Sequence, residues 1–435
     1  MLENIDKAIE KLKSFDKILI VSHYDADGLS SATIMREALK REGIDFEIMI
    51  AKEIENNVIE KIKSKSLPVL FTDIGSSPLV EEIEQPIIVI DHHEPLNTKK
   101  ENIIEINPEM NGISDYSGSC IVYFFSKKLN RSNENLSDIA LVGLAGDYSI
   151  GPEGITNHPK EILDDAIKNG LIKVEKGIRI FGHSSRPLHK ALEYSFDPYI
   201  PNISGNESAV IQFLSELRIE IKDENRFRRF VDLEKDEKEK LASAIILERL
   251  ANGVEKPTEI FGINYFLTRS IYELNEFATI VNAFGRLERY EEGMNFCLNP
   301  DEKKGEQILK EYRTLLGKYL RWAKDNLQKK EGIVFIHAKN NIHPNFIAPV
   351  VSVFSTLVDE KISVGTAYDG DLIKVSVRNK TNSEVHKILS NVASQVGGVG
   401  GGHKEACGAK IPRGNEERFL SLLEQSLKNV INKKV

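Results

Sequence analysis

KILIVSHYDADGLSSATIMREALK, residues 17–40, is the stretch of sequence that decides the fold of the first half of the chain. Its apolar run ILIV predicts a buried strand, and the pattern after Gly28 predicts an amphipathic helix. Gly28 allows the backbone to turn sharply between the two elements. The polar turn between them carries three potential metal ligands, His23, Asp25 and Asp27.

These three side chains lie at the carboxyl end of the predicted strand, where open α/β sheets place their sites. A borderline divalent cation such as Mn²⁺ accepts imidazole nitrogen as well as carboxylate oxygen. As an alternative, the two acids could simply cap the following helix. Helix capping does not account for His23, so the turn favours a metal site.

Length and composition predict several domains. At 435 residues the chain exceeds the usual size of one domain, and its 41% hydrophobic residues suffice for two or three cores. The formal net charge of −8 argues against a surface coated with positive charge for non-specific nucleic-acid binding. Because a local basic groove can coexist with an acidic whole, the net charge does not decide the substrate.

Cysteine usage and hydropathy predict a cytoplasmic location. The three cysteines are far apart and form no CxxC pair, which indicates neither a disulfide framework nor a thiolate zinc site. They are Cys120, Cys297 and Cys407. No stretch reaches the apolar length that spans a bilayer, and residues 1–17 are typical of a charged amphipathic helix rather than a signal peptide. We therefore expect a soluble cytoplasmic protein with no membrane partner.

More candidate ligands follow later elements. The apolar run LPVLF predicts a strand that ends just before Asp73, and the run IIVI predicts a strand that ends just before Asp91, His92 and His93. Asp147 follows an apolar helix instead. The alternation of strands and helices predicts a doubly wound parallel sheet, in which strand ends converge on one crevice.

So many carboxylates in one crevice would repel each other and lose hydration at a cost of several kcal/mol unless cations were present. Two divalent metals resolve this conflict, and such a pair can stabilise the attacking and leaving oxygens of a phosphoryl displacement. A single DxD motif is mostly a solvated loop, and a lone His-His pair is more often surface or core filler. The combination of these motifs in this order favours a metal centre.

The motifs HYDADG, FTDIG, IDHHEP and GDYS, which carry these side chains, resemble the four motifs of the DHH phosphoesterase superfamily. The resemblance implies two Mn²⁺ ions, with Mg²⁺ as a possible substitute. One ion would be held by His23, Asp25 and Asp73, and the other by Asp27, Asp73, His92 and Asp147. It also implies catalytic roles for Asp91, which would orient a ligand, and for His93, which would face the substrate phosphate.

The rest of the chain is expected to form three further segments. Residues 1–200 would be the DHH catalytic domain, followed by a helical insertion over 201–300 and a long connecting helix over 301–331. From residue 332 to 435 the pattern predicts a smaller α/β domain with a mixed sheet. A helix with Pro349 in its first turn is expected there.

This C-terminal region resembles the DHHA1 substrate-binding domain through SVRN and GGGH. The resemblance implies that Arg378 binds substrate phosphates together with a glycine-rich loop and a catalytic histidine, that is, with Gly400, Gly401, Gly402 and His403. As an alternative, the glycines form a flexible hinge beside a structural histidine. The family often has serine after the arginine, where this chain has Asn379.

DHH and DHHA1 domains occur together in RecJ-type single-strand exonucleases, small-oligonucleotide hydrolases and cyclic-dinucleotide phosphodiesterases. The segment RPLHKALEYSFDPYIP and the chain length resemble archaeal RecJ-like nucleases most. We therefore expect an exonuclease that hydrolyses single-stranded DNA, RNA or both in a narrow interdomain cleft, in DNA replication or repair. A replication scaffold that binds a helicase is the alternative from another class. Intact ligands favour an enzyme, with a helicase or replication factor as a further candidate partner.

Overall fold

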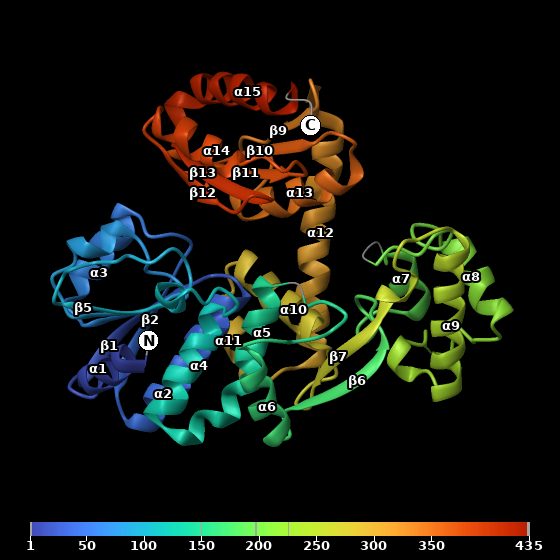
Figure 1. Ribbon diagram of the computed structural model, residues 1–435, viewed down its shortest axis with the longest axis horizontal. Helices are drawn as coiled ribbons and strands as arrows, with labels where there is room; N and C mark the ends of the chain where they lie inside the picture. Colours follow the sequence, from blue (N-terminus) through green and yellow to red (C-terminus); the bar gives the residue numbers. More distant parts are fainter. Residues whose placement is uncertain (1, 149, 196–197, 225, 433–435) are drawn as a thin grey trace. The chain divides into compact units, whose positions relative to one another are not determined.

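The computed structural model describes residues 2–148, 150–195, 198–224 and 226–432. The chain divides into two compact units, residues 1–308 and 309–435 (Figure 1). Ser149 of the GDYS motif, and Phe196 and Asp197 of the RecJ-like segment, lie outside the described residues. Among the described helices, none is both long and apolar enough to cross a lipid bilayer.

A parallel sheet forms the centre of the first unit. Its strands are β1 (Lys17–His23), β2 (Asp45–Ala51), β3 (Val69–Thr72), β4 (Ile87–Ile90) and β5 (Ile103–Ile106). Their order is β2-β1-β3-β4-β5, so the sheet has its topological switch point between β1 and β3. Ser22 is paired with Thr72, and Thr72 with Ile90. The carboxyl ends of β1, β3 and β4 therefore lie at one edge of the sheet.

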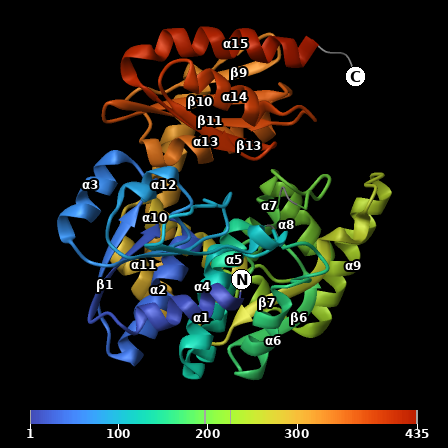
Figure 2. The same cartoon turned by 60° about the vertical axis from the view of Figure 1, so that its left-hand side comes forward.

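Helices cover both faces of this sheet, as a doubly wound fold requires. On one face lie α2 (Ala26–Glu42) and α4 (Gly118–Leu129), with α5 (Ser137–Asp147) packed against both (Figure 2). The other face packs against α3 (Asn56–Lys65) and the short helix η1 (Pro78–Glu82). Helix α1 (Leu2–Leu12) contacts β5, and α6 (Lys160–Lys168) packs against α5.

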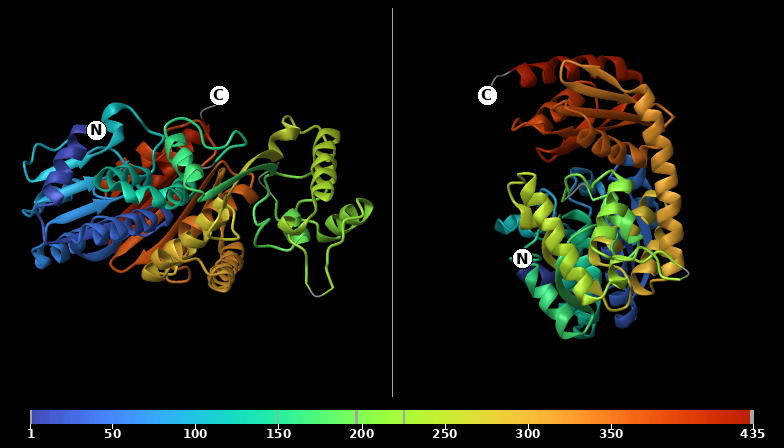
Figure 3. Two further views of the ribbon diagram at one scale, coloured as in Figure 1. Left: turned by 90° about the horizontal axis from the view of Figure 1, so that it is seen from below. Right: turned by 90° about the vertical axis from the view of Figure 1, so that its right-hand side faces the viewer.

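An antiparallel ribbon of two strands, β6 (Ile172–Ile178) and β7 (Phe261–Leu267), leads to a small helical part (Figure 3). That part contains α7 (Leu188–Glu193), α8 (Glu207–Glu216) and α9 (Lys235–Ala251). It has its own apolar core, which includes Leu188, Leu192, Val210, Leu214, Leu241 and Ile245. Residues of β6 and β7 were not predicted as strands, because their alternation is short and interrupted by glycine.

After β7 the chain returns to the parallel-sheet part. Helix α10 (Leu274–Arg286) packs against α5 and α2, and α11 (Tyr290–Leu298) packs against α2. The region that the sequence assigned to a helical insertion, 201–300, therefore also holds strand β7 of the ribbon and two helices, α10 and α11, that pack against the parallel-sheet part.

Helix α12 (Glu302–Asn326) lies where the continuous connecting helix was expected. The second unit contains a mixed sheet of order β12-β13-β11-β10-β9-β8, in which only β9 and β10 pair in parallel. Its strands are β8 (Gln328–Lys330), β9 (Ile333–His337), β10 (Ile362–Asp369), β11 (Leu372–Asn379), β12 (Val399–Gly402) and β13 (Ala406–Pro412).

Helices also cover both faces of this second sheet. Gly365 of β10 faces Ile347 and Val351 of α13 (Pro344–Leu357). The opposite face packs against α14 (Val385–Ser394) and α15 (Glu416–Asn432), whose core side chains include Leu389, Phe419 and Leu423. The predicted α/β class, with a parallel N-terminal sheet and a mixed C-terminal sheet, is therefore confirmed.

Two local predictions in the second unit were wrong. Helix α13 begins at Pro344, so Pro349 lies inside the helix rather than in its first turn. The earlier start follows from His343, whose Nδ1 accepts a hydrogen bond from the Asn345 N–H at 3.3 Å. The glycine run is not a loop or a hinge, because it forms β12 and pairs with β13.

Candidate metal centre

The turn after β1 holds His23 and Asp25 together. Asp25 caps α2, since its Oδ1 accepts the Gly28 N–H at 3.1 Å, while its Oδ2 lies 2.9 Å from His23 Nδ1. Helix capping therefore explains one oxygen of Asp25. The other oxygen faces His23, which the capping alternative left unexplained.

Asp27 is fully buried and does not cap its own helix. Its two oxygens accept the backbone N–H groups of Gly118, at 2.6 Å, and of Ser119, at 3.0 Å. These donors belong to the first turn of α4, where the helix dipole favours a negative charge. Helix α4 therefore fixes the position of this carboxylate.

Asp73 directly follows β3 in a left-handed conformation, with φ of +58°. For a residue other than glycine this conformation costs about 1–2 kcal/mol. Its N–H donates to the Ile90 carbonyl oxygen at 2.9 Å, which fixes the residue beside β4. A Cβ at Gly118 would lie 2.6 Å from Asp73 Cβ, so only glycine lets α4 approach this closely.

After β4, a buried carboxylate orients a more exposed histidine. Asp91 Oδ1 lies 2.7 Å from His93 Nδ1 and accepts the His92 N–H at 2.8 Å. Asp91 Oδ2 accepts the Ser76 N–H at 2.9 Å. Because a carboxylate only accepts, the proton of this pair lies on His93 Nδ1. The ring therefore presents Nε2 to its surroundings, and the His93 side chain is 56% exposed.

His92 lies among three of the predicted acids. Its Nε2 is 3.2 Å from Asp147 Oδ2, 3.3 Å from Asp73 Oδ1 and 4.0 Å from Asp27 Oδ2. Asp147 is the last residue of α5, so a helix end completes a cluster that otherwise comes from strand ends.

These side chains form two groups of possible ligand atoms that share Asp73. Within each group the atoms lie no more than 4.8 Å apart. The first group is His23, Asp25 and Asp73, and the second is Asp27, Asp73, His92 and Asp147. A third group of Asp73, Asp91, His92 and His93 also satisfies this distance. In this third group, Asp91 Oδ1 is already shared between the His92 N–H and the His93 ring.

Unpartnered buried atoms test whether a metal fits this cluster. Within the described residues, both carboxylate oxygens of Asp73 and Nε2 of His92 are buried and form no hydrogen bond. Leaving such atoms unsatisfied costs about 1–3 kcal/mol each. Imidazole nitrogen together with carboxylate oxygen suits Mn²⁺ and related transition metals. The residues therefore fit divalent cations.

The electrostatics of the cluster also favour added positive charge. Burial, followed by the charge of Asp27, raises the pKa of Asp73 well above its usual range and that of Asp147 to about 6. Burial would lower the pKa of His92, but the nearby carboxylates of Asp147 and Asp73, at 3.2 and 3.3 Å from its Nε2, outweigh burial and raise this pKa. Without cations the cluster thus retains protons, which metal binding would release.

Helix α10, which was not expected near this site, supports it. Asn282 of α10 accepts the Ala26 N–H through its Oδ1 at 2.9 Å. A Cβ at Gly285 would lie 1.8 Å from the Tyr24 carbonyl oxygen, so glycine is required for α10 to approach the ligand-bearing turn. The wide apolar face of α10 was the sequence signal that could have placed it on the main core rather than in an insertion.

In the second unit, Arg378 and His403 lie at the same end of the sheet. Arg378 is paired with Ala406, whose carbonyl oxygen accepts the His403 N–H at 2.9 Å. The Arg378 Nε donates to Ser352 Oγ of α13 at 2.9 Å. His403 is exposed, and the preceding glycines, Gly400, Gly401 and Gly402, form strand β12.

Asn379 has a structural role that explains its presence beside Arg378. It is buried, and its Nδ2 donates to the carbonyl oxygens of Thr381, Ser383 and Lys404 at 3.0–3.2 Å. These bonds join the loop that follows β11 to the turn that follows His403.

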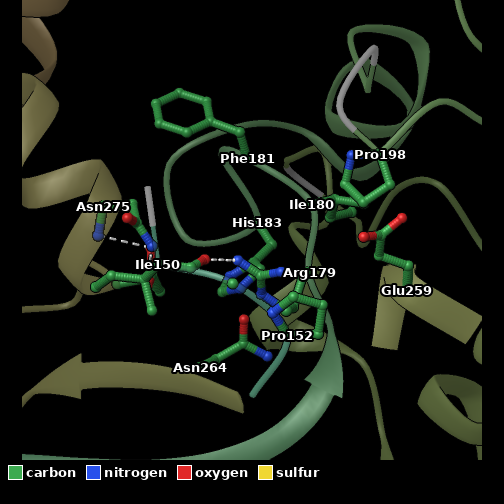
Figure 4. A pocket seen from close by; sticks show the side chains of 12 residues that line it. Ile150, Pro152, Arg179, Ile180, Phe181, His183, Pro198, Glu259, Asn264 and Asn275 are labelled. Carbon is green, nitrogen blue, oxygen red and sulfur yellow. Dashed lines mark hydrogen bonds between the residues drawn. The ribbon is translucent and has the colours of Figure 1, made fainter. Parts of the chain in front are cut away.

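A separate polar cavity of about 360 Å³ lies beside the loop that follows Asp147 (Figure 4). Its lining includes Ile150, Arg179, His183, Asn264, Glu273 and Asn275. The Arg179 guanidinium donates to the Ile150 carbonyl oxygen, and Asn275 donates to Glu273 through its Nδ2 at 2.9 Å. The cavity lies where α10, the ribbon of β6 and β7 and this loop meet. Because these polar groups bond each other, its lining does not present a set of metal ligands.

The sequence matches three family models. The DHH family N-terminal domain matches residues 17–146, the DHH-CID domain residues 180–260, and the DHHA1 domain residues 330–429. A similar protein is the uncharacterized protein MJ0831 of Methanocaldococcus jannaschii. It is 28% identical over 444 residues, which cover 98% of this chain and 96% of that protein.

Solved structures share the fold. CDC45 from Entamoeba histolytica has a TM-score of 0.67 and 11% identity, covering 97% of this chain and 98% of that one. RecJ from Thermus thermophilus, in complex with Mn²⁺, has a TM-score of 0.59 and 14% identity. The match covers 100% of this chain and 55% of the RecJ chain.

Proposed function

Because the chain belongs to the DHH/DHHA1 phosphoesterase superfamily, we propose that it is a Mn²⁺-dependent phosphodiesterase that degrades single-stranded nucleic acid as a RecJ-like exonuclease. Members of this family are metal-dependent hydrolases, and this chain has a candidate metal centre. The observation that carries the proposal is the pair of ligand groups that share Asp73, whose two buried oxygens have no hydrogen-bond partner among the described residues.

The proposed centre holds two cations. His23, Asp25 and Asp73 would hold one, and Asp27, Asp73, His92 and Asp147 the other. When bound, such a pair supplies Lewis-acid activation of the phosphoryl group and of the attacking water. Asp27 is held in place by the first turn of α4, and Asp25 by the first turn of α2, so these two ligands are preorganised by helix ends.

His93 is the proposed proton donor. Asp91 fixes the Nδ1 proton, which leaves Nε2 directed to the substrate. Burial would lower the pKa of His93, but the charge of Asp91 and the hydrogen bond to it together outweigh burial and raise this pKa to about 9. At neutral pH the ring therefore holds a proton at Nε2, which it can donate to a phosphate oxygen or to the leaving oxygen.

The proposed substrate contacts of the second unit are Arg378 and His403. A guanidinium can bind a phosphate through two parallel N–H donors, and the bond to Ser352 fixes the orientation of Arg378. His403 offers an exposed imidazole to the same substrate strand, and the neighbouring glycines offer backbone N–H groups to it.

Two alternatives differ in substrate or in class. A small-oligonucleotide or cyclic-dinucleotide phosphodiesterase would use the same metal centre on a shorter substrate. A non-catalytic replication scaffold is the alternative from another class, and the complete ligand set argues for an enzyme instead. We also propose a replication factor or a helicase as a protein partner, in DNA replication or repair.

One substrate panel separates these possibilities. Purified protein with Mn²⁺ is incubated with end-labelled single-stranded DNA, single-stranded RNA, a dinucleotide and a cyclic dinucleotide, with Asp73→Asn as the inactive control. A ladder of products from the long strands is expected. Cleavage of the short substrates alone would favour the oligonucleotide hydrolase, and no cleavage of any substrate would favour the scaffold.

The metal preference is tested in the same assay. Mn²⁺ should support faster cleavage than Mg²⁺ at limiting metal, because imidazole ligands suit Mn²⁺ better than Mg²⁺. Equal rates with the two metals would count against His23 and His92 as ligands.

A further inference from the structure

Tyr148, which directly follows Asp147, is tied to the protein at both of its ends. Its backbone N–H donates to the Leu144 carbonyl oxygen at 2.9 Å, where α5 ends. Its phenol O–H points to the carbonyl oxygens of Ser114 and Tyr116, at 3.2 and 3.4 Å. The side chain therefore bridges the end of α5 and the segment before α4, and the ring has little freedom to move.

The ring remains accessible although its polar end is anchored. Tyr148 is 36% exposed, and a tyrosine side chain consists of an apolar ring and a polar tip. Here the hydroxyl is bonded to protein carbonyls, so the exposed part includes the ring. Its centroid lies 6.4 Å from the His92 ring centroid, in an edge-on arrangement. An immobilised aromatic surface thus borders the candidate metal centre.

A neighbouring aromatic side chain does not offer such a surface. Tyr116 is 6% exposed, and its ring packs edge-on against Phe124 at a centroid distance of 5.4 Å. Its role is to build the segment that anchors Tyr148. Of these two tyrosines, Tyr148 is therefore the one that offers an accessible ring next to His92.

We propose that Tyr148 is a nucleobase platform, on which the base of a nucleotide next to the cleaved phosphate stacks. The proposal rests on the proposed function, since it names part of the binding site for the substrate strand. Stacking on an aromatic ring accepts every base, because every base has a π face, so it suits an enzyme that degrades strands of any sequence. The fixed ring also loses little rotamer freedom when a base binds.

The test compares natural oligonucleotides with oligonucleotides that carry one abasic residue, placed in turn at each position from the cleaved end. The variants are Tyr148→Leu, which removes the ring, and Tyr148→Phe, which keeps it. Tyr199→Leu, at an exposed tyrosine in the helical part, is the control. Tyr148→Leu should raise KM for the natural strand roughly 5- to 150-fold, the range expected for loss of one stacked base. Tyr199→Leu should leave KM unchanged.

The decisive result is the combination of the two changes. In the unchanged protein, an abasic residue at one position should raise KM as much as Tyr148→Leu does. In Tyr148→Leu the same abasic residue should cause no further loss, because the stacking partner is already absent. Tyr148→Phe should keep the dependence on the base. The platform would be refuted if the effects of the variant and of the abasic residue on KM multiplied, or if Tyr148→Leu left KM unchanged.

A purely structural role and a failure of the proposed function give different results. If Tyr148 only anchors the segment before α4, Tyr148→Phe should lower the melting temperature and impair cleavage as much as Tyr148→Leu does, without regard to the base. Binding of slowly cleaved phosphorothioate oligonucleotides is measured in parallel by fluorescence anisotropy. Base-dependent binding without any cleavage would refute the hydrolase and retain the platform. Cleavage without a base effect would refute the platform and retain the hydrolase.

Discussion

Asp73 combines a strained backbone with a position common to both ligand groups. Its φ is +58°, its oxygens lie among the other candidate ligand atoms, and both oxygens lack hydrogen-bond partners among the described residues. Strain of this kind persists where the surrounding structure holds it, here through the Ile90 carbonyl oxygen and the close approach of Gly118. The strain and the unpartnered oxygens both cost stability, so ligand binding is what explains the conformation of Asp73.

Asp73→Asn is the sharpest test of the metal centre, because asparagine tolerates the left-handed conformation as aspartate does. We expect hydrolysis to fall at least about 100-fold, since loss of a group that merely supports a metal ligand already costs about 10- to 100-fold. In EDTA the variant should melt at a higher temperature than the unchanged protein, because folding no longer has to keep a proton on a buried carboxyl group whose pKa is raised. Activity, metal content and melting temperature are measured.

Asp164→Asn, at an exposed acid of α6, is the control and should change none of these three quantities. In the unchanged protein, EDTA should lower the melting temperature, because a ligand that binds only the folded state stabilises it. Full activity and full metal content in Asp73→Asn would refute the shared ligand.

At the scale of elements, α10 links the metal centre to the rest of the first unit. Its last turns support the ligand-bearing turn through Asn282 and Gly285. Its N-terminus is capped by Glu273, whose Oε2 accepts the Asn275 N–H at 2.8 Å. Substitutions at both ends of this helix therefore give testable predictions.

Asn282→Ala should weaken the metal centre from a distance. The buried Ala26 N–H would lose its partner, which costs about 1–3 kcal/mol, and the turn that carries Asp25 and Asp27 would loosen. We expect Mn²⁺ affinity to fall about 10- to 100-fold in calorimetry. Asn57→Ala, at an exposed position of α3, should leave affinity unchanged. Equal affinities in the two variants would show that α10 has no supporting role.

Glu273→Gln should change how stability depends on pH. Burial, followed by the nearby charge of Glu276, raises the pKa of Glu273 to about 8 from an ordinary 4.5. The folded protein thus holds this proton more tightly than the unfolded chain, and the group's contribution to stability is lost as pH rises from about 4.5 to 8.

Glutamine keeps the capping oxygen and does not ionise. The free energy of unfolding of Glu273→Gln, relative to the unchanged protein, should therefore increase between pH 5 and pH 9, by at most about 5 kcal/mol. Urea titrations at several pH values measure it, with the exposed Glu291→Gln of α11 as the control. A constant difference across this range would mean that Glu273 ionises normally in the folded protein.

The elements differ in how far the sequence could predict them. Strands β1, β3 and β4 are continuous apolar runs buried on both faces, so their ends, and the side chains that follow them, could be placed from local pattern alone. Strand β12 consists mainly of glycine, and its pairing with β13 depends on contacts far along the chain. Helix α10 was recognisable as helical, but its packing on α2 and α5 depends on the return of the chain through β7.

At the scale of the whole molecule, the candidate chemistry is divided between two units. The metal ligands lie within residues 1–308, whereas Arg378 and His403 lie within 309–435. The division predicts that changes in the second unit alter how the substrate is held while the metals remain bound.

His403→Ala should keep the metal content and melting temperature of the unchanged protein and lose most phosphodiester cleavage, about 10- to 150-fold for one charged hydrogen bond of roughly 1.5–3 kcal/mol. The side chain is exposed, so its removal leaves no cavity. If His403 were only structural, the variant would melt earlier and cleavage would follow the loss of folded protein. Cleavage at the normal rate by a folded, metal-loaded variant would refute a substrate contact.

Arg378→Ala should chiefly weaken the binding of long strands, because a phosphate contact away from the metals adds affinity without taking part in bond cleavage. Arg378 also bonds Ser352 and the Val377 carbonyl oxygen, so two controls separate binding from packing. Ser352→Ala removes one internal partner and keeps the guanidinium, and Arg418→Ala removes an exposed arginine of α15.

Affinity for a long strand and for a dinucleotide is measured in each variant. A selective loss for the long strand in Arg378→Ala, absent from Arg418→Ala and smaller in Ser352→Ala, is expected. An equal loss in Arg378→Ala and Ser352→Ala, together with an earlier melting transition in both, would mean that the arginine holds α13 on the sheet rather than a substrate phosphate.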